Sequence, residues 1–149
     1  MKIFITGVAG FLGSHLADLM ISEGHSVAGN DNMIGGYTDN VPQNVEFYQI
    51  DCCDLENMTK AMEGGDVVYH TAATAYEGLS VFSPVLVTRN IFEASVATIT
   101  AAIRNKVNGL SIVQVWPDTD IMTTYLIKKI MNAVHRTHMV LLRKPEKMS

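Results

Sequence analysis

The sequence predicts an α/β fold, a doubly wound parallel sheet, and three observations lead to it. Short apolar runs of strand length alternate with longer segments that carry apolar residues at helical spacing. The connections between these segments are short, which favours parallel strands joined by right-handed crossovers. Apolar residues make up 48% of the 149 residues and charged residues only 17%, so the chain can bury a sizeable core.

The first predicted elements are a strand, a helix and two further strands. Residues 2–6 are a β-branched and aromatic run that ends at a glycine, which is typical of a buried strand. Residues 11–23 carry four apolar side chains at helical spacing and are followed by Gly24, which predicts a helix with a glycine stop. Residues 25–29 and 45–50 are the next predicted strands.

The following segment repeats this alternation. Residues 55–62 are predicted to form a helix closed by two glycines, and residues 66–70 a fourth strand. Residues 83–106 predict a mostly helical segment, with Pro84 near the first turn, where proline is favoured.

Three glycines lie between the first strand and the first helix at the spacing G-x-x-G-x-x-G. Gly7 permits a sharp turn, Gly10 lets the backbone approach a pyrophosphate, and Gly13 allows the helix to pack close to the strand. The helix then offers unpaired N–H groups and the positive end of its dipole to the phosphates. The alternative interpretation is a tight turn that holds no ligand.

An acid lies at the expected distance from this loop. Asp31 follows Gly13 by eighteen residues, at the end of the second strand, where a carboxylate accepts hydrogen bonds from an adenosine ribose. Together the glycines and the acid predict a Rossmann-like site for a dinucleotide. Because a carboxylate repels a 2′-phosphate, the predicted cofactor is NAD rather than NADP.

Longer motifs around these residues resemble one family, the extended short-chain dehydrogenases/reductases that act as nucleotide-sugar epimerases and dehydratases. The stretch ITGVAGFLGSHL resembles the family's TGxxGFxGSHL opening, and DNMIGG from Asp31 is similar to DNLxxG. Residues 51–54, DCCD, match D-x-x-D, and residues 70–73, HTAA, resemble HxAA at the end of the fourth strand. The resemblance covers residues 1–108 and implies a truncated member.

The resemblance implies an NAD site built from all of these motifs. In the family, the residues that match Asp51 and Cys52 meet the adenine, and the backbone that matches Thr71, Ala72 and Ala73 lines the nicotinamide side. Asn90 matches a family Asn that opens the following helix. The expected cofactor-binding residues are Gly7, Gly10, Phe11, Leu12, Gly13, Asp31, Asn32, Gly35, Asp51, Cys52, Thr71, Ala72, Ala73 and Asn90.

Simpler structural roles stay open for some of these residues. Asp51 and Asp54 precede the second helix, and an acid at such a position often caps a helix. His70 at a strand end is alternatively a structural histidine with satisfied hydrogen bonds. The adjacent Cys52 and Cys53 are interpreted as small residues near the adenine rather than redox groups.

The family's chemistry implies a Ser or Thr after the fifth strand and a Tyr-x-x-x-Lys pair, whose Lys lowers the pKa of the acid/base Tyr. This spacing occurs at Tyr125 and Lys129, ten residues past the expected fifth strand and without a preceding SSxxxYG motif. We interpret it as a chance match in an amphipathic helix. In this reading frame we therefore expect no catalytic residue, and no metal site is expected either.

Composition changes near Gly109. Residues 1–108 carry 5 Lys+Arg and 12 Asp+Glu, a net charge of −7, whereas residues 109–149 carry 6 and 3, a net charge of +3. If the coding message is read with a one-base offset after Asn108, its codons can encode the amino-acid string RFVHCSSMARYGHND and, further on, PQDPYGIAK. These two strings resemble the family motifs SSxxxYG and PYxxxK, in the family's order. Residues 109–149 are therefore interpreted as an atypical, frameshifted tail. Stop codons in the offset frame of the gene would refute this hypothesis.

The tail still carries two patterned segments. Residues 110–115 are apolar and β-branched enough to take the place of the fifth strand, and residues 120–142 predict a basic amphipathic helix. Without a fifth strand, the fourth strand becomes an exposed edge that pairs with other chains. We therefore expect marginal stability or self-association. The resemblance separately implies a homodimer, because family members usually dimerise through helices that include the one matched by residues 83–106.

Three functions are compatible with the sequence. The first is the NAD-binding part of a nucleotide-sugar epimerase or dehydratase, inactive as this chain; the alternatives are a non-catalytic NAD-binding module and an interaction protein that uses the basic tail helix. A net charge of −4 argues against a nucleic-acid binder, and no uninterrupted apolar run is long enough to span a membrane. The adjacent cysteines favour a reducing, cytoplasmic compartment, without a disulfide framework or a cysteine zinc site.

Overall fold

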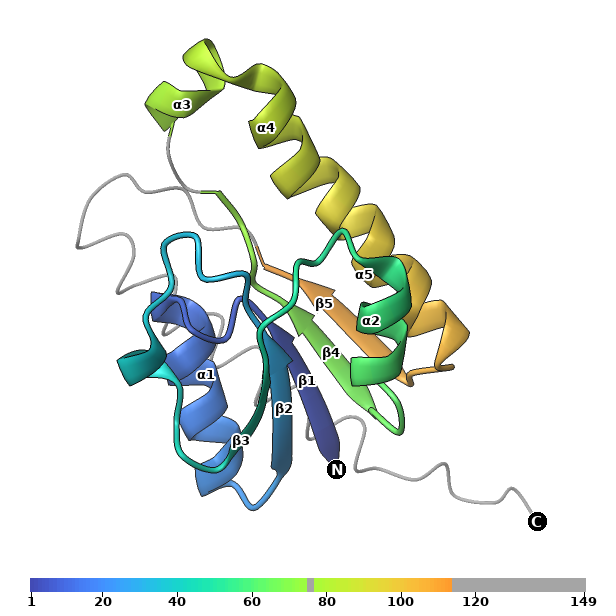
Figure 1. Ribbon diagram of the computed structural model, residues 1–149. Helices are drawn as coiled ribbons and strands as arrows, with labels where there is room; N and C mark the ends of the chain where they lie inside the picture. The colour runs from blue at the N-terminus through green and yellow to red at the C-terminus, as the bar shows by residue number, and fades with distance from the viewer. Residues whose placement is uncertain (75–76, 114–149) are drawn as a thin grey trace. The chain divides into compact units, whose positions relative to one another are not determined.

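The computed structural model describes residues 1–74 and 77–113, and their centre is a five-stranded parallel sheet (Figure 1). The sheet order is β3-β2-β1-β4-β5, and every neighbouring pair is parallel. The doubly wound parallel fold predicted from the sequence is therefore confirmed. Its strands are β1 (Lys2–Thr6), β2 (Ser26–Asn30), β3 (Val45–Tyr48), β4 (Val67–His70) and β5 (Gly109–Ile112).

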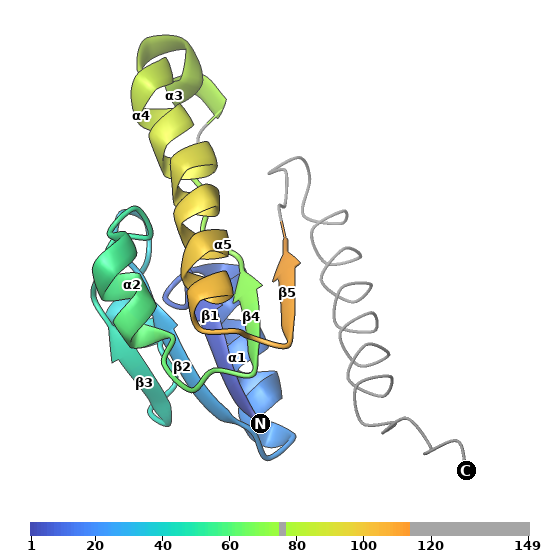
Figure 2. The ribbon, with the colours of Figure 1, turned by 90° about the vertical axis from the view of Figure 1, so that its right-hand side faces the viewer.

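Three helices pack on the two faces of this sheet (Figures 1 and 2). Helix α1 (Phe11–Ser22) contacts β1 and β2 on one face. Helices α2 (Leu55–Ala61) and α5 (Ala94–Arg104) contact each other on the opposite face. The strand order reverses between β1 and β4, which is where open α/β sheets bind ligands, outside the carboxyl ends of the strands.

The core between the sheet and the α2–α5 pair follows from the alternation of side chains along each strand. Phe4 is level with Ala28 on one neighbouring strand and with Val68 on the other, so all three point to this face. The helices complete the core with small and flexible side chains, among them Met58, Ala61, Met62, Ala94, Ala101 and Ala102. Alanines on α5 let this helix approach the sheet closely, which fixes the residues at its N-terminal end relative to the strand ends.

The single helix expected over residues 83–106 is interrupted in the structure. It consists of α4 (Pro84–Thr88), a π-helical turn η2 (Arg89–Glu93) and α5, and α3 (Glu77–Phe82) precedes it. The Ser95 hydroxyl donates to the Ile91 carbonyl at 2.6 Å, and a side chain inserted into the backbone ladder in this way is a known cause of helix irregularity. A short 3-10 turn, η1 (Thr38–Asn40), is also present between β2 and β3 and was not expected from the sequence.

The segment after Asn108 does take the place of a fifth strand, as expected. Strand β5 pairs with β4 from Val67 opposite Gly109 to His70 opposite Ile112, and Val113 N–H donates to the His70 carbonyl at 2.9 Å. The condition for self-association through an exposed β4 edge, a missing fifth strand, is therefore not met. Tyr125, Lys129 and the amphipathic segment of residues 120–142 lie outside the described residues. None of the described helices has the length and apolar character of a membrane span.

Candidate functional site

The glycine loop between β1 and α1 is held by close backbone contacts. Gly7 has φ +71°, and a Cβ there would lie 2.8 Å from the Cα of Ala72. A Cβ at Gly13 would lie 2.2 Å from the Gly7 carbonyl oxygen. The sharp turn expected at Gly7 and the close helix–strand packing expected at Gly13 are thus present, and the loop after β4 lies directly against the glycine loop.

The first turn of α1 presents unpaired main-chain donors. Gly10 is the N-cap in an extended conformation, and within the described part of the chain no side chain caps it and no acid lies in the first turn. The first intrahelical bond runs from Ser14 N–H to the Gly10 carbonyl at 3.0 Å. The N–H groups of Phe11, Leu12 and Gly13 therefore lack intrahelical acceptors and are suited to an anion.

A strap, residues 33–40, fixes the peptide groups of Ala9 beneath this turn. Ala9 N–H donates to Asp31 Oδ2 at 3.1 Å, while the Ala9 carbonyl accepts from Tyr37 N–H and from Asn40 Nδ2, each at 3.1 Å. The strap thus holds the glycine loop through the Ala9 carbonyl. Sequence reasoning missed Asn40, because its partner is a main-chain oxygen 31 residues away in the chain.

Asp31 lies at the end of β2 and is 8% exposed. Its Oδ1 accepts from Met33 N–H at 2.8 Å, and its Oδ2 accepts from Ala9 N–H. Each carboxylate oxygen still has acceptor capacity, so the group can also accept from a ribose hydroxyl. The strap passes close by, since a Cβ at Gly36 would lie 3.0 Å from Asp31 Oδ1.

Two other predicted residues shape the start of the strap. The Asn32 side-chain oxygen accepts from Ile34 N–H at 3.0 Å, which turns the chain directly after Asp31. Gly35 has φ +96°, a conformation that L side chains rarely adopt. The structure thus gives both residues a local role in the loop that carries Asp31.

The two acids of the D-x-x-D motif have different roles. Asp54 is the N-cap of α2 and accepts from Asn57 N–H at 3.2 Å, which confirms the capping interpretation for this residue. Asp51 does not cap the helix: it accepts from Cys53 N–H at 2.8 Å and from Arg89 Nη1 at 3.0 Å. Burial alone would raise the pKa of Asp51, but these hydrogen bonds outweigh it and hold the pKa below its usual range.

The Cys52 side chain points into the core rather than into the loop. It is 7% exposed, and its Sγ accepts from Asn30 Nδ2 at 3.3 Å. Burial raises the pKa of the Cys52 thiol, which keeps it protonated and poorly reactive. Only the backbone of Cys52 is placed to meet a ligand.

A buried relay of hydrogen bonds joins β1, β4 and α5. Ala72 N–H donates to Thr6 Oγ1 at 3.2 Å, Thr6 Oγ1 lies 2.7 Å from His70 Nδ1, and His70 Nε2 lies 3.0 Å from Ser95 Oγ. Because the Ser95 proton goes to the Ile91 carbonyl, every group is satisfied when His70 is neutral with its proton on Nε2. Burial lowers the pKa of His70 to about 4. The geometry gives His70 a structural role.

This histidine makes the stability of the fold depend on pH. The pKa of His70 falls from an ordinary 6.5 to about 4 in the folded chain, so the unfolded chain binds the extra proton between these values. The contribution of His70 to the free energy of unfolding is therefore fully present above pH 6.5. It declines by about 3 kcal/mol in total as the pH falls toward 4. Urea unfolding at pH 7, 6 and 5 measures this slope.

The matched variants for this measurement are His70→Gln and His15→Gln. The first lowers stability but flattens the slope between pH 7 and 5, because an amide does not titrate. The second changes a histidine on the exposed side of α1 and leaves the slope intact. An undiminished slope in His70→Gln contradicts the assignment.

The remaining predicted residues lie on the loop after β4 and on η2. The Thr71 hydroxyl donates to the Thr6 carbonyl at 2.6 Å, and Ala73 is exposed. Asn90 Nδ2 donates to Thr74 Oγ1 at 3.1 Å, and Asn90 Oδ1 accepts from Arg89 Nη1 at 3.2 Å. The structure thus places Gly7 against Ala72 and bonds Ala9 to Asp31. Arg89, a residue the sequence did not single out, bonds to both Asp51 and Asn90.

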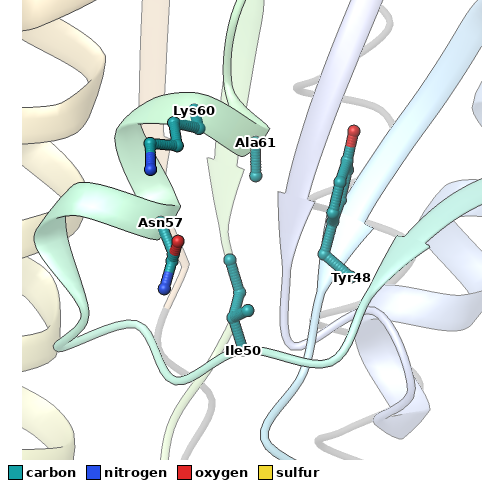
Figure 3. Close-up of a pocket in the computed structure, with 5 residues that line it drawn as sticks. All are labelled: Tyr48, Ile50, Asn57, Lys60 and Ala61. Carbon is teal, nitrogen blue, oxygen red and sulfur yellow. The ribbon is translucent and has the colours of Figure 1, made fainter.

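A surface pocket lies between β3 and α2 (Figure 3). Tyr48 stands on its strand side, and Asn57, Lys60 and Ala61 line its helix side, with Ile50 between them. None of the predicted cofactor-binding residues lines it. The groups that can hold a dinucleotide are the strand-end loops after β1, β2 and β3, and Ile50 of the pocket directly precedes Asp51 in the last of these.

The chain resembles known proteins over the region that contains these loops. Residues 3–115 match the model of the NAD dependent epimerase/dehydratase family. UDP-N-acetyl-alpha-D-glucosaminuronate decarboxylase of Bacillus cytotoxicus is 37% identical over 75 residues, which cover 48% of this chain and 23% of that protein. UDP-glucose 4-epimerase of Mycolicibacterium smegmatis is 32% identical over 90 residues, which cover 56% of this chain and 29% of that protein.

A solved structure gives the same correspondence. The crystal structure of Thermus thermophilus UDP-glucose 4-epimerase in complex with NAD superimposes with a TM-score of 0.69 and 32% identity, covering 74% of this chain and 36% of that chain. The matched regions make up between 23% and 29% of the length of the two curated relatives named above.

Proposed function

The chain belongs to the NAD-dependent epimerase/dehydratase family, and we propose that it binds NAD as the cofactor half of an enzyme that acts on a nucleotide-sugar. The family match confirms the resemblance drawn from the motifs, and NAD is confirmed as the cofactor of the family. The substrate and the reaction of this chain are proposals, since the match covers only part of each relative.

One observation carries the proposal: the uncapped first turn of α1 and the carboxylate of Asp31 are joined through Ala9. Ala9 N–H donates to Asp31 Oδ2 at 3.1 Å, so the phosphate-binding donors and the ribose acceptor are held in one rigid unit. The N–H groups at the head of α1 fit a pyrophosphate, and Asp31 fits the two hydroxyls of an adenosine ribose. The same carboxylate disfavours a 2′-phosphate, which supports NAD over NADP.

Bound NAD would accept a hydride from a sugar carbon and, in an epimerase, return it to the other face. The protein's part is to hold the cofactor and to move the proton of the sugar hydroxyl. The described residues contain no Tyr-x-x-x-Lys pair for the second task, and Tyr125 and Lys129 lie outside them. We therefore propose a turnover about 10²–10⁴-fold below that of a complete enzyme.

Two measurements on the full chain test this function. Calorimetric titration is expected to show binding of NAD that is tighter than binding of NADP, whereas an absence of NAD binding would favour an interaction protein. A turnover assay with UDP-glucose is expected to give a very low rate. No turnover together with NAD binding favours the non-catalytic module, which the missing SSxxxYG motif supports.

A homodimer is proposed for the same chain because α4, η2 and α5 carry exposed apolar side chains. Val85, Phe92, Val96 and Ile103 recur at helical spacing and are 81%, 69%, 47% and 71% exposed. Exposed apolar side chains that recur in this way fit an interaction surface. Sedimentation velocity is expected to show a dimer that Phe92→Asp dissociates. Val81→Asp on α3 serves as the control and is expected to leave the dimer intact. A monomer at all concentrations contradicts the proposal.

A further inference from the structure

The order of the strands fixes which loop the base of a dinucleotide would reach. The glycine loop follows β1, Asp31 follows β2, and Asp51 follows β3, and these strands lie side by side in the order β3-β2-β1. With the pyrophosphate over β1 and the ribose at Asp31, which is the proposed function on which this inference rests, the base extends to the loop after β3. The Asp51 carboxylate is then the acid that faces the base.

The Asp51 carboxylate is held on both oxygens. Cys53 N–H donates to Oδ1 at 2.8 Å, and Arg89 Nη1 donates to Oδ2 at 3.0 Å. Each oxygen keeps acceptor capacity beyond its one bond. The side chain is 32% exposed, so it remains accessible from the loop.

Arg89 is itself fixed by its surroundings. Its Nη1 also donates to Asn90 Oδ1 at 3.2 Å, and Asn90 Nδ2 donates to Thr74 Oγ1 at 3.1 Å. The Cys53 thiol approaches the Arg89 carbonyl at 3.6 Å. Arg89 therefore connects the loops after β3 and β4 to the π-helical turn η2, a kind of turn that is frequent at functional sites.

We propose that Arg89 is a positioning residue that, through Asp51, makes this site select a 6-aminopurine over a 6-oxopurine. A carboxylate accepts from the exocyclic amino group of adenine, and it repels the carbonyl oxygen that hypoxanthine carries at the same position. Arg89 holds the carboxylate in one orientation by a charge-assisted hydrogen bond. Without that bond only Cys53 N–H, at Oδ1, holds the carboxylate, which leaves Oδ2 free to move, and the discrimination falls.

Stability alone does not distinguish this role from that of an ordinary surface ion pair, because exposed pairs contribute little to folding. The chain offers a matched control in Arg104, whose Nη1 lies 2.9 Å from Glu56 Oε1 between α5 and α2. The Arg104 side chain is 44% exposed, close to the 41% of Arg89. Loss of either pair is comparable for the fold, but only Arg89 contacts the loop after β3.

The experiment titrates the full chain with NAD and with nicotinamide hypoxanthine dinucleotide, which differs only at the base. The unaltered chain is expected to prefer NAD by about 10-fold or more, as a hydrogen bond to a charged group predicts. Arg89→Ala is expected to lower this preference by about 5- to 10-fold through weaker NAD binding alone. Arg89→Lys restores part of the preference, and Arg104→Ala leaves it unchanged.

Asp51→Asn supplies the second arm, because an amide both donates and accepts and therefore removes the preference. If Arg89→Ala weakens both dinucleotides equally, or leaves the preference intact, the positioning role is wrong. If Asp51→Asn keeps the preference, the base does not lie at Asp51, and the inference fails while NAD binding stands. If the unaltered chain binds neither dinucleotide, the proposed function fails together with it.

Discussion

Replacing Gly10 with leucine is expected to abolish NAD binding and to leave the sheet folded. Gly10 has φ −81° and ψ 170°, a conformation open to any residue, and a Cβ there would meet only the Gly7 carbonyl oxygen, at 3.2 Å. The larger side chain therefore enters open space at the head of α1, where the pyrophosphate is proposed to lie. Loss of two or more charge-assisted hydrogen bonds corresponds to a fall in affinity of at least about 100-fold.

Two other glycines separate binding from folding in this test. Gly13→Ala is expected to damage both, because its Cβ would lie 2.2 Å from the Gly7 carbonyl oxygen and the loop would have to move. Gly78→Ala in α3 meets nothing within 4 Å and is expected to change neither. Calorimetry measures the affinities and thermal unfolding the stabilities. NAD affinity that survives in Gly10→Leu would mean that the glycine loop does not hold the pyrophosphate.

Features set by neighbouring residues were predictable from the sequence. The strands β1 and β4 follow from apolar runs bounded by turn residues, and the Asp54 cap follows from an acid three residues before its N–H donor. The turn at Gly7 and the close packing at Gly13 follow from glycine spacing alone, because each depends on contacts within the β1–α1 unit and the adjoining strand end.

Strand ends were less predictable, because tertiary partners decide them. Strand β2 continues to Asn30, a polar residue that the pattern assigns to a loop, because its Nδ2 donates to the Ile50 carbonyl at 2.9 Å. Strand β3 stops at Tyr48, where Ile50 N–H turns back to the Tyr48 carbonyl at 3.0 Å. Neither contact is visible in the periodicity of the sequence.

The residues missed at the site share one property: each acts on a partner far along the chain. Arg89 reaches Asp51, 38 residues away, and Ser95 reaches His70, 25 residues away. Their residue types are common on helices, so no local pattern separates them from solvent-exposed positions. Only the packing of α5 against the sheet and the π-helical turn before it bring these side chains to the strand ends.

Replacing Asp31 with alanine is expected to reduce NAD affinity and stability together. The change leaves Ala9 N–H and Met33 N–H without their acceptor, and the buried Ala9 donor alone costs about 1–3 kcal/mol when unpaired. It also removes the acceptor proposed for the ribose hydroxyls. Calorimetry with NAD is expected to show a loss of about 100-fold, and urea unfolding a lower midpoint.

Asp31→Asn retains the shape of the side chain and removes its charge, although its amide nitrogen cannot accept from one of the two backbone N–H groups, so some stability is lost as well. The charge repulsion against a 2′-phosphate disappears, so the preference for NAD over NADP is expected to fall by about 10-fold. Asp39→Asn makes the same charge change at an exposed position of the strap and is expected to alter neither preference nor stability. Equal effects of the two asparagine variants would show that Asp31 acts through the general field of the loop and not through contact with the ribose.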